Sequence, residues 1–356
     1  MSAAIYLGTS AFTAAGWDTA FYPAGMKAAD YLSYYATKFG AVEIDSTFYA
    51  APAAATVTRW RDRTPEGFII AAKVPQAITH EKCLLECDEE FAQFVETMSL
   101  LGDRLGPLLL QFPYFKGEIF QSGVQFLARL KAFFRKLPKG KKFAVEIRNK
   151  SWIKPQFLDL LREYNVAFVL QDQSWMPRAA ELFEKYDPVT ADFTYIRWLG
   201  DRKGIETLTK VWDKTIIDRS SEMQEWVKYC RQIQRRGVTI YAFANNHYAG
   251  HGPGTVALFK QLYGIVDTVS APIPARQADL FAGQKEGSAE QVPAPNQSQK
   301  DAKSKSAPFT IRRVRHPKKR AFSAEGSASR PRVKRAGETP ALLKPKGRPP
   351  ASFPPC

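Results

Sequence analysis

The chain has 356 residues, 45% of them hydrophobic, and a formal net charge of +16. Of that charge, +12 lies between Lys285 and Cys356, where 17 Lys and Arg residues stand against 5 Asp and Glu residues. No run of about 18 apolar residues is present, which argues against a membrane span, and a strand-like run from Ile5 leaves no room for a targeting signal. We therefore expect a cytoplasmic protein, with association with the nucleoid as a further option.

Eight short β-rich runs alternate with helical segments along the chain. The runs are rich in Val, Ile, Leu, Phe and Ala, which is typical of strands buried on both faces. They cover residues 5–9, 41–45, 68–74, 107–112, 143–147, 166–171, 193–198 and 238–243. Apolar residues at helical spacing predict helices at 30–39, 88–101, 157–164 and 223–236.

Strict alternation of eight strand-and-helix units predicts an α/β fold, a (β/α)8 TIM barrel, over residues 1–268. An open, doubly wound sheet is the alternative, and the lack of a Gly-rich phosphate turn after Thr9 argues against it. Residues 269–283 form a linker in this scheme. Residues 284–356 are rich in Lys, Arg and Pro, and we expect disorder there because few large apolar residues are present to offset the entropy of ordering.

Polar residues follow nearly every predicted strand. In a TIM barrel the carboxyl ends of the strands meet on one face, where active sites are built, so these residues should converge. Glu43 and Asp45 are two apart and leave the same face of a strand, as do Glu146 and Arg148. The predicted catalytic residues are Glu43, Asp45, His80, Glu146 and Asp172, and the predicted substrate-binding residues are Ser10, Lys73, Gln111, Arg148, Arg197, Asn245, Asn246 and His247.

Such a set of residues supports acid–base chemistry, phosphate binding or a divalent metal held by oxygen ligands. The alternative is a structural ion-pair network that closes the top of the barrel. No ligand cluster has the spacing of a known metal site, so the identity of a metal stays unknown. His247 and His251 lie in a stretch with two Gly residues, which favours a polar loop over a shared helix face. The sequence has no GxSxG, HExxH or P-loop motif.

Several short motifs appear in a fixed order. They are GTS at 8–10, VEIDSTFY at 42–49, AKVP at 72–75, LLQFP at 109–113, VEIR at 145–148, YIR at 195–197 and FANNH at 243–247. In this order they resemble the domain of unknown function 72 family (YecE-like) over roughly residues 5–265. The resemblance implies a TIM barrel and no established reaction. The chain departs from the family pattern at three places. The family usually has Asn where Asp45 stands and a second Pro where Tyr114 stands, and it commonly has a His and then a Gly after the Arg of the seventh strand, where this chain has Trp198, Leu199 and Gly200.

Two functions are compatible with these observations. The first is a hydrolase or another enzyme that processes phosphate esters or nucleic acid at the mouth of the barrel. The second is a non-catalytic accessory protein of DNA replication or repair. For the second, residues 277–281 resemble the bacterial sliding-clamp-binding pentapeptide, with Gln277, Leu280 and Phe281 as its anchors. Packing within the chain, or chance, is the alternative explanation of this peptide.

The basic end predicts binding to DNA or RNA, because clustered cations bind phosphates by releasing counterions. Lys346 and Arg348 lie in a Lys-Gly-Arg-Pro sequence that resembles an AT-hook core, which enters the minor groove. A solubilising extension is the alternative. The expected nucleic-acid contacts are Arg312, Arg313, Lys318, Lys319, Arg320, Lys346 and Arg348.

Overall fold

The computed structural model describes residues 3–265. The predictions made above for the linker, for residues 277–281 and for the basic end therefore lie outside the described residues. Within the described part of the chain, no helix combines the length and the apolar composition needed to cross a bilayer.

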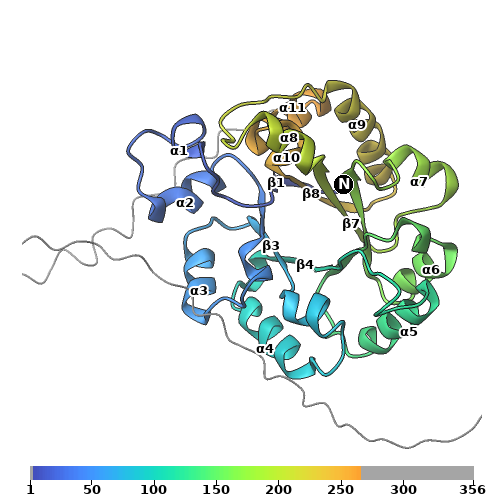
Figure 1. The fold of residues 1–356 in the computed structure, drawn as a ribbon. Helices are drawn as coiled ribbons and strands as arrows, with labels where there is room; N and C mark the ends of the chain where they lie inside the picture. Colours follow the sequence, from blue (N-terminus) through green and yellow to red (C-terminus); the bar gives the residue numbers. More distant parts are fainter. Residues whose placement is uncertain (1–2, 266–356) are drawn as a thin grey trace, which may run out of the picture. The chain divides into compact units, whose positions relative to one another are not determined.

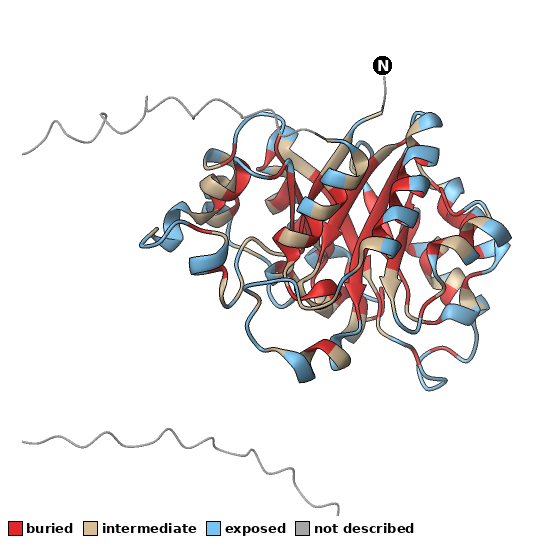
Figure 2. Cartoon of the chain, turned by 90° about the horizontal axis from the view of Figure 1, so that it is seen from above, coloured by how far each residue is buried: buried red, intermediate tan, exposed pale blue. Residues whose placement is uncertain are grey.

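Eight parallel strands form a nearly closed barrel with helices around it, which confirms the predicted (β/α)8 fold (Figure 1). Each strand lies within two residues of its predicted bounds at either end. Most strand residues are buried, as the runs of large apolar and Ala residues predict for strands covered on both faces (Figure 2). The strands are β1 (Ile5–Thr9), β2 (Ala41–Ile44), β3 (Ile69–Lys73), β4 (Leu105–Gln111), β5 (Phe143–Glu146), β6 (Ala167–Gln173), β7 (Phe193–Gly200) and β8 (Thr239–Ala244).

The helices lie outside the barrel (Figure 1). They are α1 (Trp17–Ala20), α2 (Tyr31–Ala36), α3 (Ala54–Asp62), α4 (Asp88–Ser99), α5 (Gly123–Phe134), α6 (Pro155–Glu163), α7 (Ala179–Lys185), α8 (Arg202–Leu208), α9 (Ser220–Arg235), α10 (Asn246–Ala249) and α11 (Gly252–Tyr263). Shorter helical turns are η1 (Ala28–Asp30), η2 (Ser46–Phe48), η3 (Ala77–Glu81), η4 (Gly102–Arg104) and η5 (Lys150–Trp152).

Two sequence-based predictions about helices need correction. The predicted helix at 30–39 is shorter, because α2 ends at Ala36 and is preceded by the separate turn η1. The stretch around His247, predicted to be a loop, forms the one-turn helix α10 and the start of α11. The Asn245 side chain caps α10 by accepting a hydrogen bond from the His247 backbone N–H at 2.9 Å. His251 caps α11 through its Nδ1, which accepts from the Gly254 backbone N–H at 3.2 Å.

Two layers of buried side chains follow from the alternation along the strands. One set, which includes Ala71, Leu109, Val169 and Phe243, forms a small cluster of its own. The larger cluster joins the opposite strand faces to the surrounding helices. Because the strands are in register, Gln111 pairs with Glu146, and Gln171 pairs with Arg197. The polar ends of several strands are thus level with one another.

One seam of the barrel differs from the others. Seven parallel ladders join neighbouring strands, and among the described residues no ladder joins β1 to β2. The Tyr35 hydroxyl on α2 lies between these two strands: it accepts from the Thr9 backbone N–H at 2.7 Å and lies 3.2 Å from the Ala41 carbonyl oxygen. The strands are close here, since a Cβ on Gly8 would lie 1.8 Å from that carbonyl oxygen.

Candidate active site at the carboxyl ends of the strands

Arg197 on β7 is the centre of a buried ion-pair network. Its NH2 donates to Glu43 Oε1 at 2.7 Å, and its NH1 donates to Glu146 Oε2 at 2.7 Å. Arg197 is 2% exposed and both carboxylates are fully buried. The Tyr195 hydroxyl, two residues earlier on the same strand, donates to Glu43 Oε2 at 2.5 Å. Three strands that are distant in sequence, β2, β5 and β7, therefore direct these side chains to one point.

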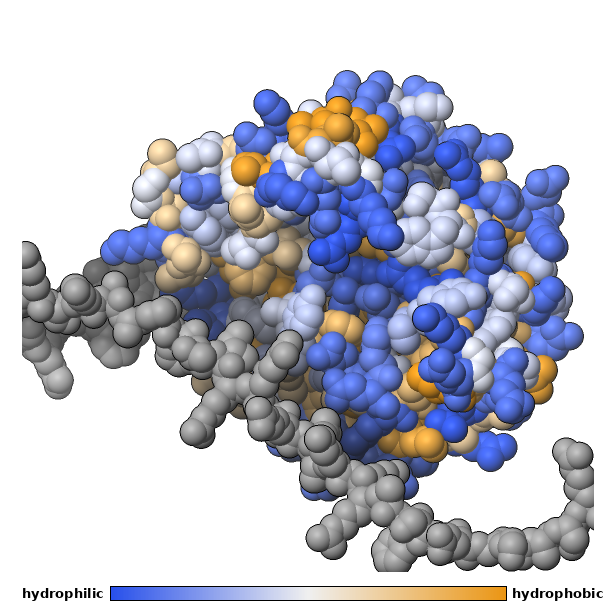
Figure 3. All heavy atoms as spheres, viewed as in Figure 1, coloured by the Kyte–Doolittle hydropathy of each residue, from blue (hydrophilic) through white to orange (hydrophobic). Residues whose placement is uncertain are grey.

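A second, partly exposed layer adjoins this network. Lys73 at the end of β3 pairs with Asp45 after β2, with Nζ and Oδ1 2.9 Å apart. Arg148 after β5 pairs with Glu146, and Arg197 NH2 lies 3.7 Å from Asp45 Oδ1. The side chains of Lys73, Arg148 and Asp45 are 11%, 13% and 32% exposed. Hydrophilic residues accordingly gather over the middle of this face of the molecule (Figure 3).

The turns after β2 and β3 hold this second layer in place. The Thr47 hydroxyl in η2 lies 2.9 Å from the Ile44 carbonyl oxygen and 2.8 Å from that of Lys73, so it links the two strand ends. Pro75 follows β3, and a proline has no N–H with which to continue a ladder. The backbone segments that carry Asp45 and Lys73 are thus fixed relative to each other.

The two buried glutamates have opposite pKa shifts. Burial, reinforced by Asp45, raises the pKa of Glu43 above its usual value, although Arg197 and Lys73 oppose the shift. Burial also acts to raise the pKa of Glu146, but Arg148 and Arg197 outweigh it and hold the pKa at about 2. Carboxyl groups whose surroundings separate their pKa values in this way are suited to different protonation states at one pH.

His80 lies beside the same cations, in the turn η3. Its Nδ1 is 2.9 Å from the Thr79 hydroxyl, and its ring packs edge-on against Phe48 with centroids 4.9 Å apart. Burial, with the positive charges of Lys73 and Arg148, lowers the pKa of His80 to about 4. The imidazole is therefore neutral near pH 7, and an anion bound between these cations would raise its pKa again.

The predicted amide and hydroxyl residues divide into two groups. Asn245 Nδ2 donates to the buried Ser10 hydroxyl at 2.9 Å, and the buried Oε1 of Gln111 has no hydrogen-bond partner among the described residues. Gln111 is the last residue of β4 and Asn245 directly follows β8, so both amides lie at this face. Asn246, by contrast, accepts from the Gly252 backbone N–H at 2.8 Å and so supports the start of α11. His247 Nε2 lies 3.2 Å from Glu206 Oε1, which links α10 to α8.

Asp172 does not belong to the cluster, and its predicted catalytic role has no support in the geometry. Its Oδ2 accepts from Trp226 Nε1 on α9 at 2.8 Å and from the Tyr248 hydroxyl on α10 at 2.9 Å. The reason is strand alternation: Asp172 follows Gln171, so the two side chains leave opposite faces of β6. Asp172 attaches helices to the outside of the barrel.

Two residues of this region escaped the sequence analysis. Tyr195 binds Glu43, and Gln171 Nε2 donates to the Ile147 carbonyl oxygen at 2.8 Å. The signal that could have found Tyr195 is the same two-residue spacing that joins Glu146 to Arg148, since Tyr195 precedes Arg197 by two. In residues 3–265, no group of three or more His, Cys, Asp or Glu side chains is placed to hold a metal ion.

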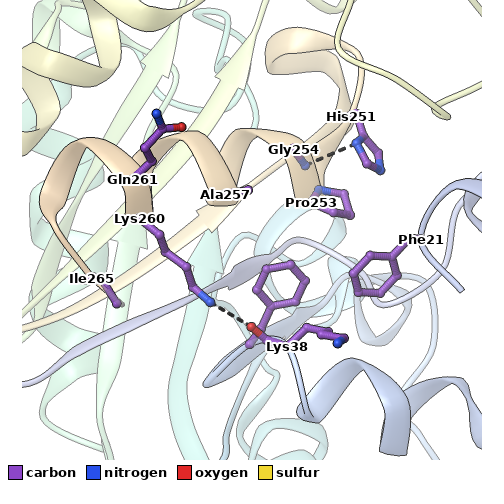
Figure 4. Close-up of a pocket in the computed structure, with 10 residues that line it drawn as sticks. Phe21, Lys38, His251, Pro253, Gly254, Ala257, Lys260, Gln261 and Ile265 are labelled. Carbon is purple, nitrogen blue, oxygen red and sulfur yellow. Dashed lines mark hydrogen bonds between the residues drawn. The ribbon is translucent and has the colours of Figure 1, made fainter. Parts of the chain in front are cut away.

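A separate cavity of about 460 Å³ lies beside α11, away from this cluster. It is lined mainly by apolar surface, including Phe21, Phe39, Pro253, Ala257 and Ile265 (Figure 4). None of the predicted catalytic or substrate-binding residues contributes to it. The chemistry-bearing side chains and the large cavity are therefore two different features of the molecule.

Comparison with known proteins gives a consistent family. The chain is 35% identical over 126 residues to UPF0759 protein YecE of Escherichia coli (strain K12), a match that covers 35% of this chain and 42% of that protein. It is 24% identical over 305 residues to UPF0759 protein YunF of Bacillus subtilis (strain 168), which covers 78% of this chain and all of that protein.

Solved structures share the fold. A DUF72 family protein from Thermotoga maritima MSB8 is 25% identical, with a TM-score of 0.57 over 73% of this chain and 99% of that chain. One from Enterococcus faecalis V583 is 21% identical, with a TM-score of 0.56 over 74% and 99%. The family profile described as "Protein of unknown function DUF72" matches residues 6–278, and the chain therefore belongs to the DUF72 family.

Proposed function

We propose that the barrel is an enzyme that hydrolyses phosphate esters at the carboxyl-end mouth. The observation that carries this proposal is the position of Lys73 and Arg148, whose charged groups are partly exposed at the mouth and paired with Asp45 and Glu146. A guanidinium fork matches the geometry of phosphate oxygens, and an ammonium adds a compact positive charge.

The alternative explanation of this cluster is a structural ion-pair network. The two layers allow both roles, because the buried layer supports the structure and the partly exposed layer is open to a ligand. Glu43, Glu146 and Arg197 have almost no exposure, so a ligand at the mouth would not touch them without displacing other side chains. We assign to these three residues the role of holding the side chains of the second, partly exposed layer in position. Asp45, Lys73 and Arg148 are the partly exposed members, and in this proposal they contact the ligand.

The reaction in this proposal consumes one water molecule. Asp45 takes a proton from water, whose oxygen forms a bond to phosphorus while the bond from phosphorus to the ester oxygen breaks. Lys73 gives a proton to the leaving alkoxide, and Asp45 then returns its proton to Lys73 across the 2.9 Å that separates them. The products are an alcohol and, from a phosphomonoester, inorganic phosphate or, from a phosphodiester, a phosphomonoester; both side chains regain their starting charge.

Asp45→Asn is expected to lower kcat by about 100-fold, because a positioned acid–base group contributes about 10²- to 10⁴-fold. The measurement is hydrolysis by the full chain of a panel of phosphomonoesters, followed by phosphate release, and of phosphodiesters, followed by alcohol release, with and without added divalent cations. The matched control is Asp159→Asn, an exposed carboxylate on α6 that pairs with Arg162. If the wild-type chain turns over no ester in the panel, the hydrolase proposal is wrong.

We also propose that the basic end binds DNA or RNA, and that residues 277–281 bind a bacterial sliding clamp. The support is the sequence alone: +12 of the net charge lies after residue 284, and the pentapeptide has a Gln and two apolar anchors. Replacing Arg312, Arg313, Lys318, Lys319 and Arg320 by Gln should flatten the salt dependence of DNA affinity. Removing one cation that neutralises a phosphate lowers the slope of log K against log salt by about 0.9. An unchanged slope in fluorescence-anisotropy titrations would refute the assignment of nucleic-acid binding to the basic end.

The proposed clamp peptide is tested separately. The double substitution Leu280→Ala and Phe281→Ala should abolish binding to the sliding clamp.

A further inference from the structure

The exposed aromatic side chains of the barrel are all on one face. Among the large hydrophobic side chains exposed in residues 3–265, three are aromatic: Tyr49, Tyr114 and Trp175, which are 75%, 65% and 49% exposed. They follow β2, β4 and β6, so each lies on a loop at the carboxyl ends of the strands. Aromatic rings are costly to leave in water, and three of them at the end of the barrel that carries the polar site indicate a surface that receives a ligand.

Two of these rings lie near the cations of the proposed site, Trp175 directly and Tyr49 through Phe48. The Arg148 guanidinium carbon lies 5.9 Å from the centroid of the Trp175 ring. Tyr49 packs against Phe48 with centroids 5.3 Å apart, and Lys73 Nζ lies 5.5 Å from the Phe48 centroid. Each proposed phosphate-binding cation is thus next to an aromatic side chain. Arg148 lies beside the exposed ring of Trp175, and Lys73 lies beside Phe48, which in turn packs against the exposed ring of Tyr49.

The loops that carry the rings are held by hydrogen bonds. Asn149, next to Arg148, accepts from the Phe115 backbone N–H and donates to the Phe115 carbonyl, both at 2.9 Å, which fixes the loop of Tyr114. The Met176 backbone N–H donates to the Gln173 carbonyl at 3.0 Å, which closes the turn of Trp175. Rings on such anchored loops lose little conformational entropy when a ligand stacks on them.

We propose that the ligand at the mouth is a nucleoside phosphate, with its base stacked on Trp175 and its phosphate held by Arg148 and Lys73. This inference rests on the proposed phosphate-ester function and names the substrate class for the same site. Flat aromatic surface beside a cation binds a planar base together with its phosphate, whereas a simple sugar phosphate has no aromatic ring to stack.

The test compares AMP with ribose 5-phosphate, which carry the same phosphate and differ by the base. Calorimetric titration of the full chain in the Asp45→Asn background keeps turnover slow, and the basic end attracts both ligands alike, so the ratio of affinities isolates the base. We expect AMP to bind at least about tenfold more tightly, in line with the effect of one stacked base. Trp175→Ala removes that gain and leaves the affinity for ribose 5-phosphate unchanged, while Trp175→Tyr keeps most of it.

The matched control is Val124→Ala, which removes an exposed apolar side chain on α5 and should leave both affinities unchanged. Equal binding of the two ligands overturns the nucleoside assignment and leaves the phosphate-ester function standing. Binding of neither ligand overturns the phosphate-ester function itself. A preference for AMP that survives Trp175→Ala overturns the placement of the base on that ring.

Discussion

Arg197→Met is expected to lower the free energy of unfolding by about 3–5 kcal/mol, because it removes the cation that two buried carboxylates share, and of the two only Glu146 keeps an ion pair among the described residues, with Arg148. Arg197 donates to both Glu43 and Glu146, and all three side chains are almost completely buried. Met keeps the apolar volume of the side chain and removes only its charge and its donors. The measurement is urea-induced unfolding of the full chain, followed by circular dichroism.

A control and a rescue make this result specific. Arg236→Met removes an exposed partner of Asp187, and surface pairs of this kind contribute at most about 1 kcal/mol. Adding Glu43→Gln and Glu146→Gln to Arg197→Met removes the uncompensated charges and should recover much of the lost stability. A loss below about 1 kcal/mol for Arg197→Met alone would show that the network is not needed for the fold.

Acidification from pH 5 to pH 2 is expected to remove about 3 kcal/mol of stability through Glu146 alone, since its pKa is about 2 when folded and near 4.5 when unfolded. A lowered folded pKa means that the unfolded state takes up the proton first. The contribution is therefore complete above the unfolded pKa and is lost as the pH falls through the folded one. Glu146→Gln should flatten the curve of stability against pH in this window.

Glu43 should behave in the opposite way. Its folded pKa is raised, so its contribution is present when the pH is low and is lost as the pH rises through the folded pKa. Glu43→Gln should therefore leave the acid limb of the curve in place. Glu163→Gln, on an exposed carboxylate that pairs with Lys131, is the control and should change neither limb. If Glu146→Gln and Glu163→Gln give the same acid limb, the lowered pKa of Glu146 is refuted.

The barrel and most of its polar cluster could be predicted from the sequence because both depend on local periodicity. Runs of buried-strand residues gave the eight strands, and the two-residue spacing placed Glu43 beside Asp45 and Glu146 beside Arg148 on common faces. Asp172 was misassigned because its strand continues for two residues beyond the predicted end, so Asp172 is an outward-facing strand residue and not the first residue of a loop. Its partners, Trp226 and Tyr248, are distant in sequence and carry no local signal.

The division of the polar cluster into two layers could not be predicted either. The exposure of each polar side chain depends on how deep in the barrel its strand ends. That depth depends on the register between neighbouring strands, which cannot be read from sequence periodicity. The three exposed aromatic side chains at the mouth could not be predicted from the sequence for a related reason. Tyr49, Tyr114 and Trp175 lie in separate loops, and only the closed barrel brings those loops to one face.

The seam between β1 and β2 gives the barrel a weakest line of opening. At the other seven junctions, separating the strands means breaking a row of peptide hydrogen bonds. At this one, the interstrand link runs through the phenol of Tyr35, which belongs to a helix and not to the sheet. We therefore expect local fluctuations to open the cylinder into a curved sheet along this line, and the packing of α2 to set how often that happens. The Thr9 amide, whose acceptor is that phenol, is the natural reporter of the rate at which the cylinder opens.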